Sequence, residues 1–170
     1  VSQACRDGIG CVGAKLYYPD DTVQHAGIIL GINGVADHGH KHLPRDNPGY
    51  CGRLGSVQNL SAVTAACMVM RRAVFERVGG FNAADLAIAY NDVDLCLRVL
   101  QAGYRNLWTP HAELRHFESV SRGRRGGMRQ RLRRMREFRY MRERWADKLD
   151  RDPAYNPNLT LLHEDFSLRP

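Results

Sequence analysis

The segment 91–103 narrows the possible folds more than any other part of the sequence, because it carries the signals for both ends of a helix. Asn91 is a favourable N-cap, and Asp92 and Asp94 fall in the first turn, where the helix dipole favours acidic side chains. Gly103 is a typical residue just beyond a helix C-terminus. An apolar face lies between these signals, formed by Leu95, Leu97, Val99 and Leu100.

Apolar segments with little polar interruption precede this helix. Residues 9–18 and 23–30 are predicted to be two strands joined by a turn at 19–21, where a proline is followed by two aspartates. Residues 59–70 are rich in Val, Thr, Ala and Met, which predicts a buried strand. The next segment, 71–78, has helical spacing until two glycines end it.

The remaining stretches around the helix are predicted to be loop or extended chain. Residues 31–57 are rich in glycine, proline and histidine and form a long loop, of the kind that is often functional in compact domains. Residues 104–108 and 112–117 are predicted as two short extended segments separated by Thr109-Pro110. Strands on both sides of helices indicate an α/β fold.

Arginine is concentrated in one region near the C-terminus. Residues 122–144 hold eleven arginines and two glutamates, a local charge of +9, whereas the whole chain is +7 and the remainder is therefore −2. An apolar series with spacings of three or four predicts one long amphipathic helix from Arg124 onward: Met128, Leu132, Met135, Phe138, Met141, Trp145 and Leu149. Its basic face suits an anionic membrane surface, a nucleic acid or plain solvent. Nucleic acid is disfavoured because the stripe lacks interleaved aromatic residues.

Composition bounds the class of protein. With 170 residues and 44% hydrophobic composition, the chain is long enough for one globular domain. It has neither a membrane-spanning run nor a secretory leader, so we expect a cytoplasmic protein, or one peripheral to the inner face of the membrane. The five cysteines are odd in number and lack a C-x-x-C pair, which predicts reduced, mostly buried thiols. The first residue is Val, which suggests a fragment or a processed product.

Several polar residues are candidates for chemistry. Asp92, at a helix start, is suited to act as a base, although acidic first turns also occur simply to complement the helix dipole. His116 ends an extended segment and is followed by polar residues that could face an anion, although a single histidine is more often structural. A third candidate is a zinc site formed by His38, His40 and His42, which Gly39 and Lys41 disfavour.

The order and spacing of a larger set of motifs resemble the inverting family 2 glycosyltransferases, especially the bacterial rhamnosyltransferase-like members. The matching segments extend over most of the chain: Val12-Gly13-Ala14-Lys15-Leu16, Tyr18-Pro19-Asp20, Gln24-His25-Ala26-Gly27, Thr64-Ala65-Ala66-Cys67, Arg71-Arg72, Val78-Gly79-Gly80-Phe81, Asn91-Asp92-Val93-Asp94-Leu95, Gly103-Tyr104, Pro110, His116 with Glu118-Ser119, and Tyr155-Asn156-Pro157-Asn158-Leu159. Each motif is weak alone, and their shared order carries the resemblance.

The resemblance implies a partial GT-A sandwich that transfers a hexosyl or deoxyhexosyl group, with inversion, from a nucleotide-sugar to a saccharide or lipid-linked acceptor in polysaccharide biosynthesis. Asn91-Asp92 then matches the family's catalytic pair, with Asp92 as the base that deprotonates the acceptor hydroxyl. His116 resembles the family histidine that binds a divalent Mg²⁺ or Mn²⁺ at the diphosphate. Donor or acceptor binding is expected of Thr64, Ala65, Asn91, Asp94, Glu118, Ser119 and Arg122.

The resemblance is incomplete at one end. The family's metal-binding Asp-x-Asp lies upstream of the region that matches Val12 to Leu16, and the triplet Asp92-Val93-Asp94 fits the base motif instead. We therefore expect residues 1–121 to be the acceptor-side, catalytic-base portion of the domain and 122–170 a basic helix and tail packed on it. The isolated chain is then inactive, and a non-catalytic remnant that binds sugar, nucleotide or a partner is the alternative.

Overall fold

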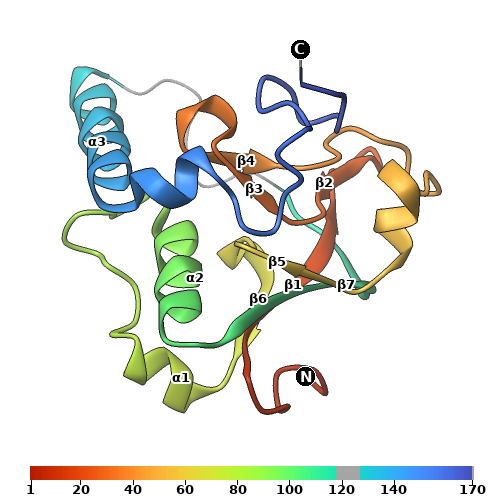
Figure 1. Ribbon diagram of the computed structural model, residues 1–170, viewed down its shortest axis with the longest axis horizontal. Coiled ribbons are helices and arrows are strands. Elements are labelled where there is room, and N and C mark those ends of the chain that lie inside the picture. Colours follow the sequence, from red (N-terminus) through yellow and green to blue (C-terminus); the bar gives the residue numbers. More distant parts are fainter. Residues whose placement is uncertain (118–126, 170) are drawn as a thin grey trace.

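A computed structural model describes residues 1–117 and 127–169, and it is a mixed α/β structure built on one curled sheet (Figure 1). The long strand β1 (Ile9–Tyr17) lies at its centre and pairs in parallel with β7 (Arg105–Arg115). On its other edge β1 pairs antiparallel with β2 (Val23–His25) and β6 (Met68–Met70). The strand β5 (Gln58–Leu60) extends the sheet antiparallel to β7.

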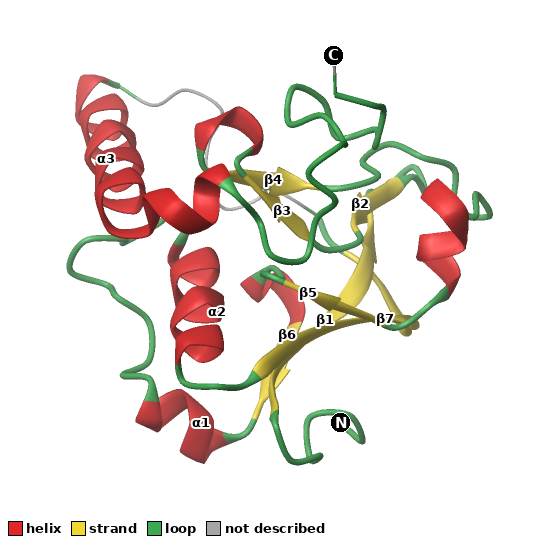
Figure 2. Ribbon diagram, in the orientation of Figure 1, coloured by secondary structure: helices red, strands yellow, loops and turns green. Residues whose placement is uncertain are grey.

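A second, two-stranded sheet is formed by β3 (Ile28–Leu30) and β4 (Ala36–His38). The α-helices α1 (Arg72–Arg77), α2 (Asn91–Gln101) and α3 (Met128–Asp150) gather along one flank of the molecule, as Figure 2 shows. Short 3₁₀ turns complete the fold: η1 (Ile32–Gly34), η2 (Tyr50–Gly55) and η3 (Ala65–Cys67). The α/β class that the sequence indicates is confirmed.

Two glycines of β1 let its neighbours approach closely. A Cβ built on Gly10 would lie 2.2 Å from Val99 Cγ1 of α2, and one built on Gly13 would lie 2.6 Å from the Cβ of Val63. The core around these contacts is made of fully buried side chains from α2, β1 and β7, including Cys96, Leu97 and Trp108. The close approach of helix to sheet places the first turn of α2 beside η3.

The helix α3 and the C-terminal tail pack on this body. Trp145 of α3 is buried and donates from Nε1 to Asp94 of α2 at 2.9 Å. In the tail, the buried Asp152 accepts hydrogen bonds from the Leu30 amide at 2.8 Å and from the Ser61 hydroxyl. Phe166 stacks on His40 with ring centroids 4.2 Å apart. Within the described residues, no helix is both long and apolar enough to cross a bilayer.

Several local predictions need correction. The run 23–30 is two strands rather than one, because Gly27 has φ 100° and Leu60 occupies the space beside it. The predicted loop 31–57 contains β4 and two 3₁₀ turns. The predicted strand 59–70 is interrupted by η3, so its two ends join opposite sides of the sheet.

Two further corrections concern α2 and β7. Asn91 is the first residue of α2 rather than its N-cap, which is Tyr90 in the left-handed region with φ 59° and no side-chain cap. The segments on either side of Thr109-Pro110 form one strand, because a shift of register between Thr109 and Glu113 accommodates the proline, which has no N–H to donate. Of the cysteines, Cys11 and Cys96 are buried while Cys5 and Cys51 are exposed, so the thiols are not mostly buried.

Candidate functional site

One open cleft lies where the first turn of α2, the η3 turn, β4 and the end of β7 meet. Its volume of about 600 Å³ is in the range of small-molecule sites. The residues that line it come from distant parts of the sequence: Tyr18, Gln24, Asp37, His38, Lys41, Thr64, Ala65, Ala66, Phe81, Ile88, Tyr90, Asn91, Asp92, His116 and Phe117. The cleft therefore brings together five of the residues to which the family resemblance assigns a role: Thr64, Ala65, Asn91, Asp92 and His116.

The Asp92 carboxylate is held by two backbone amides. Its Oδ2 accepts a hydrogen bond from the Ala65 N–H at 3.1 Å, and its Oδ1 accepts one from Val93 at 2.9 Å. The residue is partly exposed in the cleft, at the positive end of the α2 dipole. This arrangement fixes the direction of the carboxylate while each oxygen keeps room for another hydrogen-bond donor.

The residue before α2 adds a second feature to this side of the cleft. Tyr90 holds a left-handed backbone, which is unusual for a bulky residue and is concentrated at functional sites. Burial, together with the nearby carboxylates of Asp37 and Glu137, raises the pKa of its phenol. Tyr90 is therefore a protonated hydroxyl at neutral pH, able to donate as well as accept.

The η3 turn is positioned by a buried histidine. The Thr64 hydroxyl caps the turn by accepting from the Ala66 amide at 3.3 Å, and the Thr64 amide points at Nε2 of His25 at 3.4 Å. His25 is fully buried, and burial first and His38 second lower its pKa well below the usual range. Its Nδ1 lies 2.7 Å from Nδ1 of His38, so one of the two rings donates its Nδ1 proton to the other.

His116 is oriented by Gln24 through two contacts. The Gln24 amide group donates to the His116 carbonyl at 3.2 Å, which identifies the other Gln24 atom as the oxygen. That oxygen lies 2.8 Å from His116 Nδ1, so Nδ1 carries the proton and Nε2 keeps its lone pair. A metal-binding histidine usually donates its other ring N–H to a carbonyl or carboxylate in this way, which fixes the ring and its tautomer.

An ion-pair cluster forms another wall. Lys41 Nζ lies 2.8 Å from Asp37 and 2.6 Å from Glu164 of the tail. Burial disfavours the charge on Lys41, but the bonds to these two carboxylates outweigh burial and raise its pKa. This wall of the cleft thus presents the Lys41 cation and the Asp37 carboxylate, neither of which the sequence indicated as a site residue, beside His38, which the sequence suggested only for a zinc site.

Some predicted residues lie elsewhere. Asp94 is fully buried and does not line the cleft; it accepts from Arg98 Nε at 2.8 Å and from Trp145, and so connects α2 to α3. Glu118, Ser119 and Arg122 lie outside the described residues. The proposed zinc triplet does not converge: His38 faces His25, His40 packs on Phe166, and His42 stacks on Tyr18.

Comparison with known proteins points in the same direction as the motifs. The chain is 54% identical over 168 residues to an uncharacterized protein, y4gI, of Sinorhizobium fredii, covering 99% of the chain and 18% of that protein. It is 38% identical over 176 residues to the O-antigen biosynthesis protein RfbC of Myxococcus xanthus, covering 99% of the chain and 13% of RfbC. No protein-family model matches the chain.

A shorter match adds an enzyme name. Over 62 residues the chain is 36% identical to the N-acetylglucosaminyl-diphospho-decaprenol L-rhamnosyltransferase of Mycobacterium tuberculosis, covering 36% of the chain and 20% of the enzyme. The chain therefore spans a fifth or less of the length of these relatives. The names of RfbC and of the rhamnosyltransferase point to glycosyl transfer in polysaccharide biosynthesis.

Proposed function

We propose that this chain is the acceptor-side, catalytic-base part of an inverting GT-A glycosyltransferase of family 2, which uses a nucleotide-sugar donor and a saccharide or lipid-linked acceptor. The observation that carries the proposal is the cleft itself. It unites Asn91-Asp92, Thr64-Ala65 and His116, which are up to 52 positions apart in the sequence, around a volume of suitable size. The names of two relatives support the reaction class.

Asp92 acts as the general base in this mechanism. As the acceptor oxygen attacks the anomeric carbon, its proton passes to a carboxylate oxygen of Asp92, and the bond from the anomeric carbon to the diphosphate breaks on the opposite face. The amides of Ala65 and Val93 hold the carboxylate in one orientation, so the base does not need to be ordered during the reaction. Ala65 and Ala66 are exposed small residues that leave room for the sugar beside the base.

His116 is the residue of this chain that fits a divalent metal. Its Nε2 keeps a lone pair because Gln24 fixes the proton on Nδ1. Within residues 1–117 and 127–169, no three or more metal-binding side chains form a cluster, so His116 would share the ion with groups outside the described chain. A bound Mg²⁺ or Mn²⁺ supplies positive charge to the departing diphosphate.

Substitution of the base tests the proposal. In a protein that joins this chain to an upstream half with an Asp-x-Asp motif, Asp92→Asn is expected to lower sugar transfer at least about 100-fold, because general-base catalysis contributes about 10²–10⁴-fold. Asp7→Asn is the matched control, since Asp7 is a fully exposed aspartate near the N-terminus. Nucleoside diphosphate release from a panel of nucleotide-sugars is the readout, with thermal unfolding to verify the fold. Near-normal transfer by Asp92→Asn would show that the base is another residue.

Substitution of Gln24 tests the assignment of His116. Gln24→Leu removes both contacts that orient the histidine, and such partners change metal affinity by about 10–100-fold. We expect the Mn²⁺ concentration for half-maximal transfer to rise by that factor while transfer at saturating metal is largely retained. An unchanged metal requirement would argue against His116 as a ligand.

A further inference from the structure

The N-terminal half of α3 has an apolar strip on the side turned away from the protein. Met128, Leu132 and Met135 are 70%, 47% and 59% exposed. Successive residues of an α-helix are rotated by about 100° around its axis, so these three side chains lie within about 60° of one another around the helix. By the same rotation, Glu137 and Met141 lie on the opposite side. Glu137 and Met141 are almost completely buried, so the strip faces outward and contacts no core.

The arrangement departs from the single apolar face that the sequence predicts. The series from Met128 to Leu149 divides into two parts: Met141, Trp145 and Leu149 are buried, whereas the first three members are outward, and Phe138 lies between them. A Cβ built on Gly34 would lie 3.0 Å from Phe138, which shows that Phe138 rests on the η1 turn. Close packing of the apolar series on the body therefore begins near Phe138, and the outward side of the earlier turns has no partner in the described chain.

Arginines flank the strip on both sides. Residues 128–139 contain six arginines and one glutamate, Glu137, whose carboxylate instead accepts from the amides of Ile88 at 3.0 Å and Ala89 at 3.4 Å. Five of these arginines make neither a hydrogen bond nor an ion pair within the described residues: Arg129, Arg131, Arg134, Arg136 and Arg139.

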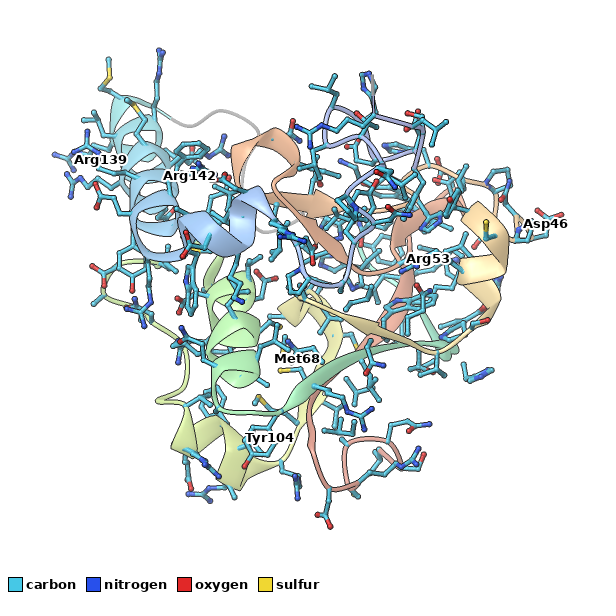
Figure 3. The ribbon with its side chains drawn as sticks, in the orientation of Figure 1. Asp46, Arg53, Met68, Tyr104, Arg139 and Arg142 are labelled. Atoms are coloured by element: carbon cyan, nitrogen blue, oxygen red, sulfur yellow. The ribbon has the colours of Figure 1, made fainter. Side chains whose placement is uncertain are left out.

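The later arginines of α3 differ in this respect. Arg142 is paired with Asp150 at 2.7 Å, and Arg144 lies 3.6 Å from Asp94. Figure 3 shows Arg139 on the side of α3 away from the sheet, and Arg142 nearer to the rest of the molecule. Among the described arginines of α3, those without a partner thus lie in the same turns as the apolar strip.

We propose that this strip, Met128, Leu132 and Met135 with its flanking arginines, is a docking surface for an anionic lipid membrane. An apolar strip flanked by arginines matches the surface of an anionic bilayer. The apolar side chains can enter the boundary of the acyl chains, while the arginines contact the lipid phosphates. A nucleic acid would use the arginines but would gain little from outward methionine and leucine side chains. The inference stands apart from sugar transfer, because it uses no residue of the cleft.

Vesicle cosedimentation of the 170-residue chain tests this surface. We expect binding to vesicles of phosphatidylcholine with 30% phosphatidylglycerol, at least about tenfold tighter than to phosphatidylcholine alone and weakened by salt. Arg129→Gln with Arg136→Gln should weaken binding about 25-fold, from about fivefold per arginine. Leu132→Ser with Met135→Ser should weaken it about tenfold or more.

Two control pairs change the same chemistry elsewhere. Arg6→Gln with Arg72→Gln removes two exposed charges, and Leu162→Ser with Leu168→Ser removes two apolar side chains that are 69% and 77% exposed. Both control pairs should bind anionic vesicles within about threefold of the unaltered chain. The proposal is wrong if the chain ignores anionic vesicles, if the control pairs weaken binding as much as the strip pairs, or if the strip pairs abolish self-association or RNA binding instead.

Discussion

Asp92 and Asp94 stand two positions apart on the same helix, and the structure predicts opposite consequences when each is replaced. Asp94 is fully buried and accepts hydrogen bonds from Arg98 and Trp145. Removing one partner of a buried ion pair typically costs about 3–5 kcal/mol, because the other charge is left uncompensated. Asp94→Ala should therefore lower the free energy of unfolding by about 3–5 kcal/mol.

Asp92→Ala should leave stability almost unchanged. Its side chain is partly exposed, and it contributes two hydrogen bonds to amides and a favourable position at the helix dipole. Water replaces these interactions at a partly exposed site, so the expected loss is about 1 kcal/mol. For a chain of this length, the contrast corresponds to a fall in Tm of about 6–20 °C for Asp94→Ala and of about 2–4 °C for Asp92→Ala.

Urea unfolding followed by tryptophan fluorescence measures the difference. Trp145 donates directly to Asp94, so Asp94→Ala should also shift the native emission, whereas Asp92→Ala should not. Trp145→Phe removes the indole donor while keeping the ring, and should lower stability by about 1–3 kcal/mol. Equal destabilisation by Asp92→Ala and Asp94→Ala would refute the division of roles between the two carboxylates.

Three other predictions follow from packing and burial. Gly13→Ala should destabilise the fold by about 1–3 kcal/mol in urea unfolding because its Cβ meets Val63, whereas Gly55→Ala, with open space around it, should not. Burial raises the pKa of Asp152 above 3.8 despite its hydrogen bonds, so the folded protein holds this proton more tightly than the unfolded chain does. The free energy of unfolding should therefore fall as the pH rises from 3.8 through the raised pKa. Asp152→Asn should flatten this dependence, and an unchanged profile would exclude Asp152 as its source. Glu137→Gln should speed amide hydrogen exchange at Ile88 and Ala89 about fivefold by weakening two hydrogen bonds, with Glu143→Gln as the control in mass-spectrometric exchange. Unaltered exchange would contradict the role of Glu137.

Much of the secondary structure could be predicted from the sequence, because the signals are local. The helix that ends before Gly103, the turn at 19–21 and the helix stopped at Gly79 each depend on residues a few positions apart. Predictions failed where a distant contact intervened. Gly27 ends a strand because Leu60 fills the space beside it, and β7 continues through Pro110 because β1 shifts its register.

The candidate site divides in the same way. Asp92 and His116 were identifiable from motif order, since residue type and spacing are properties of the chain itself. The tertiary structure alone showed that Gln24 orients His116, that Lys41 and Asp37 share the cleft, and that Asp94 belongs to the core. These facts depend on which side of each element is covered, and that is set by packing between segments far apart in sequence.

The arginine-rich helix shows the limit most clearly. Its apolar period predicted one long helix, because spacing of three or four residues determines which side chains share a helix face, and α3 follows that period from Met128 with a kink at Trp145. The period did not determine where that face would be buried. The body reaches only the part of α3 from about Phe138 onward, so the same kind of residue becomes core at Met141 and exposed surface at Met135. Burial is a property of the assembled chain, because it requires a partner surface that local sequence does not contain.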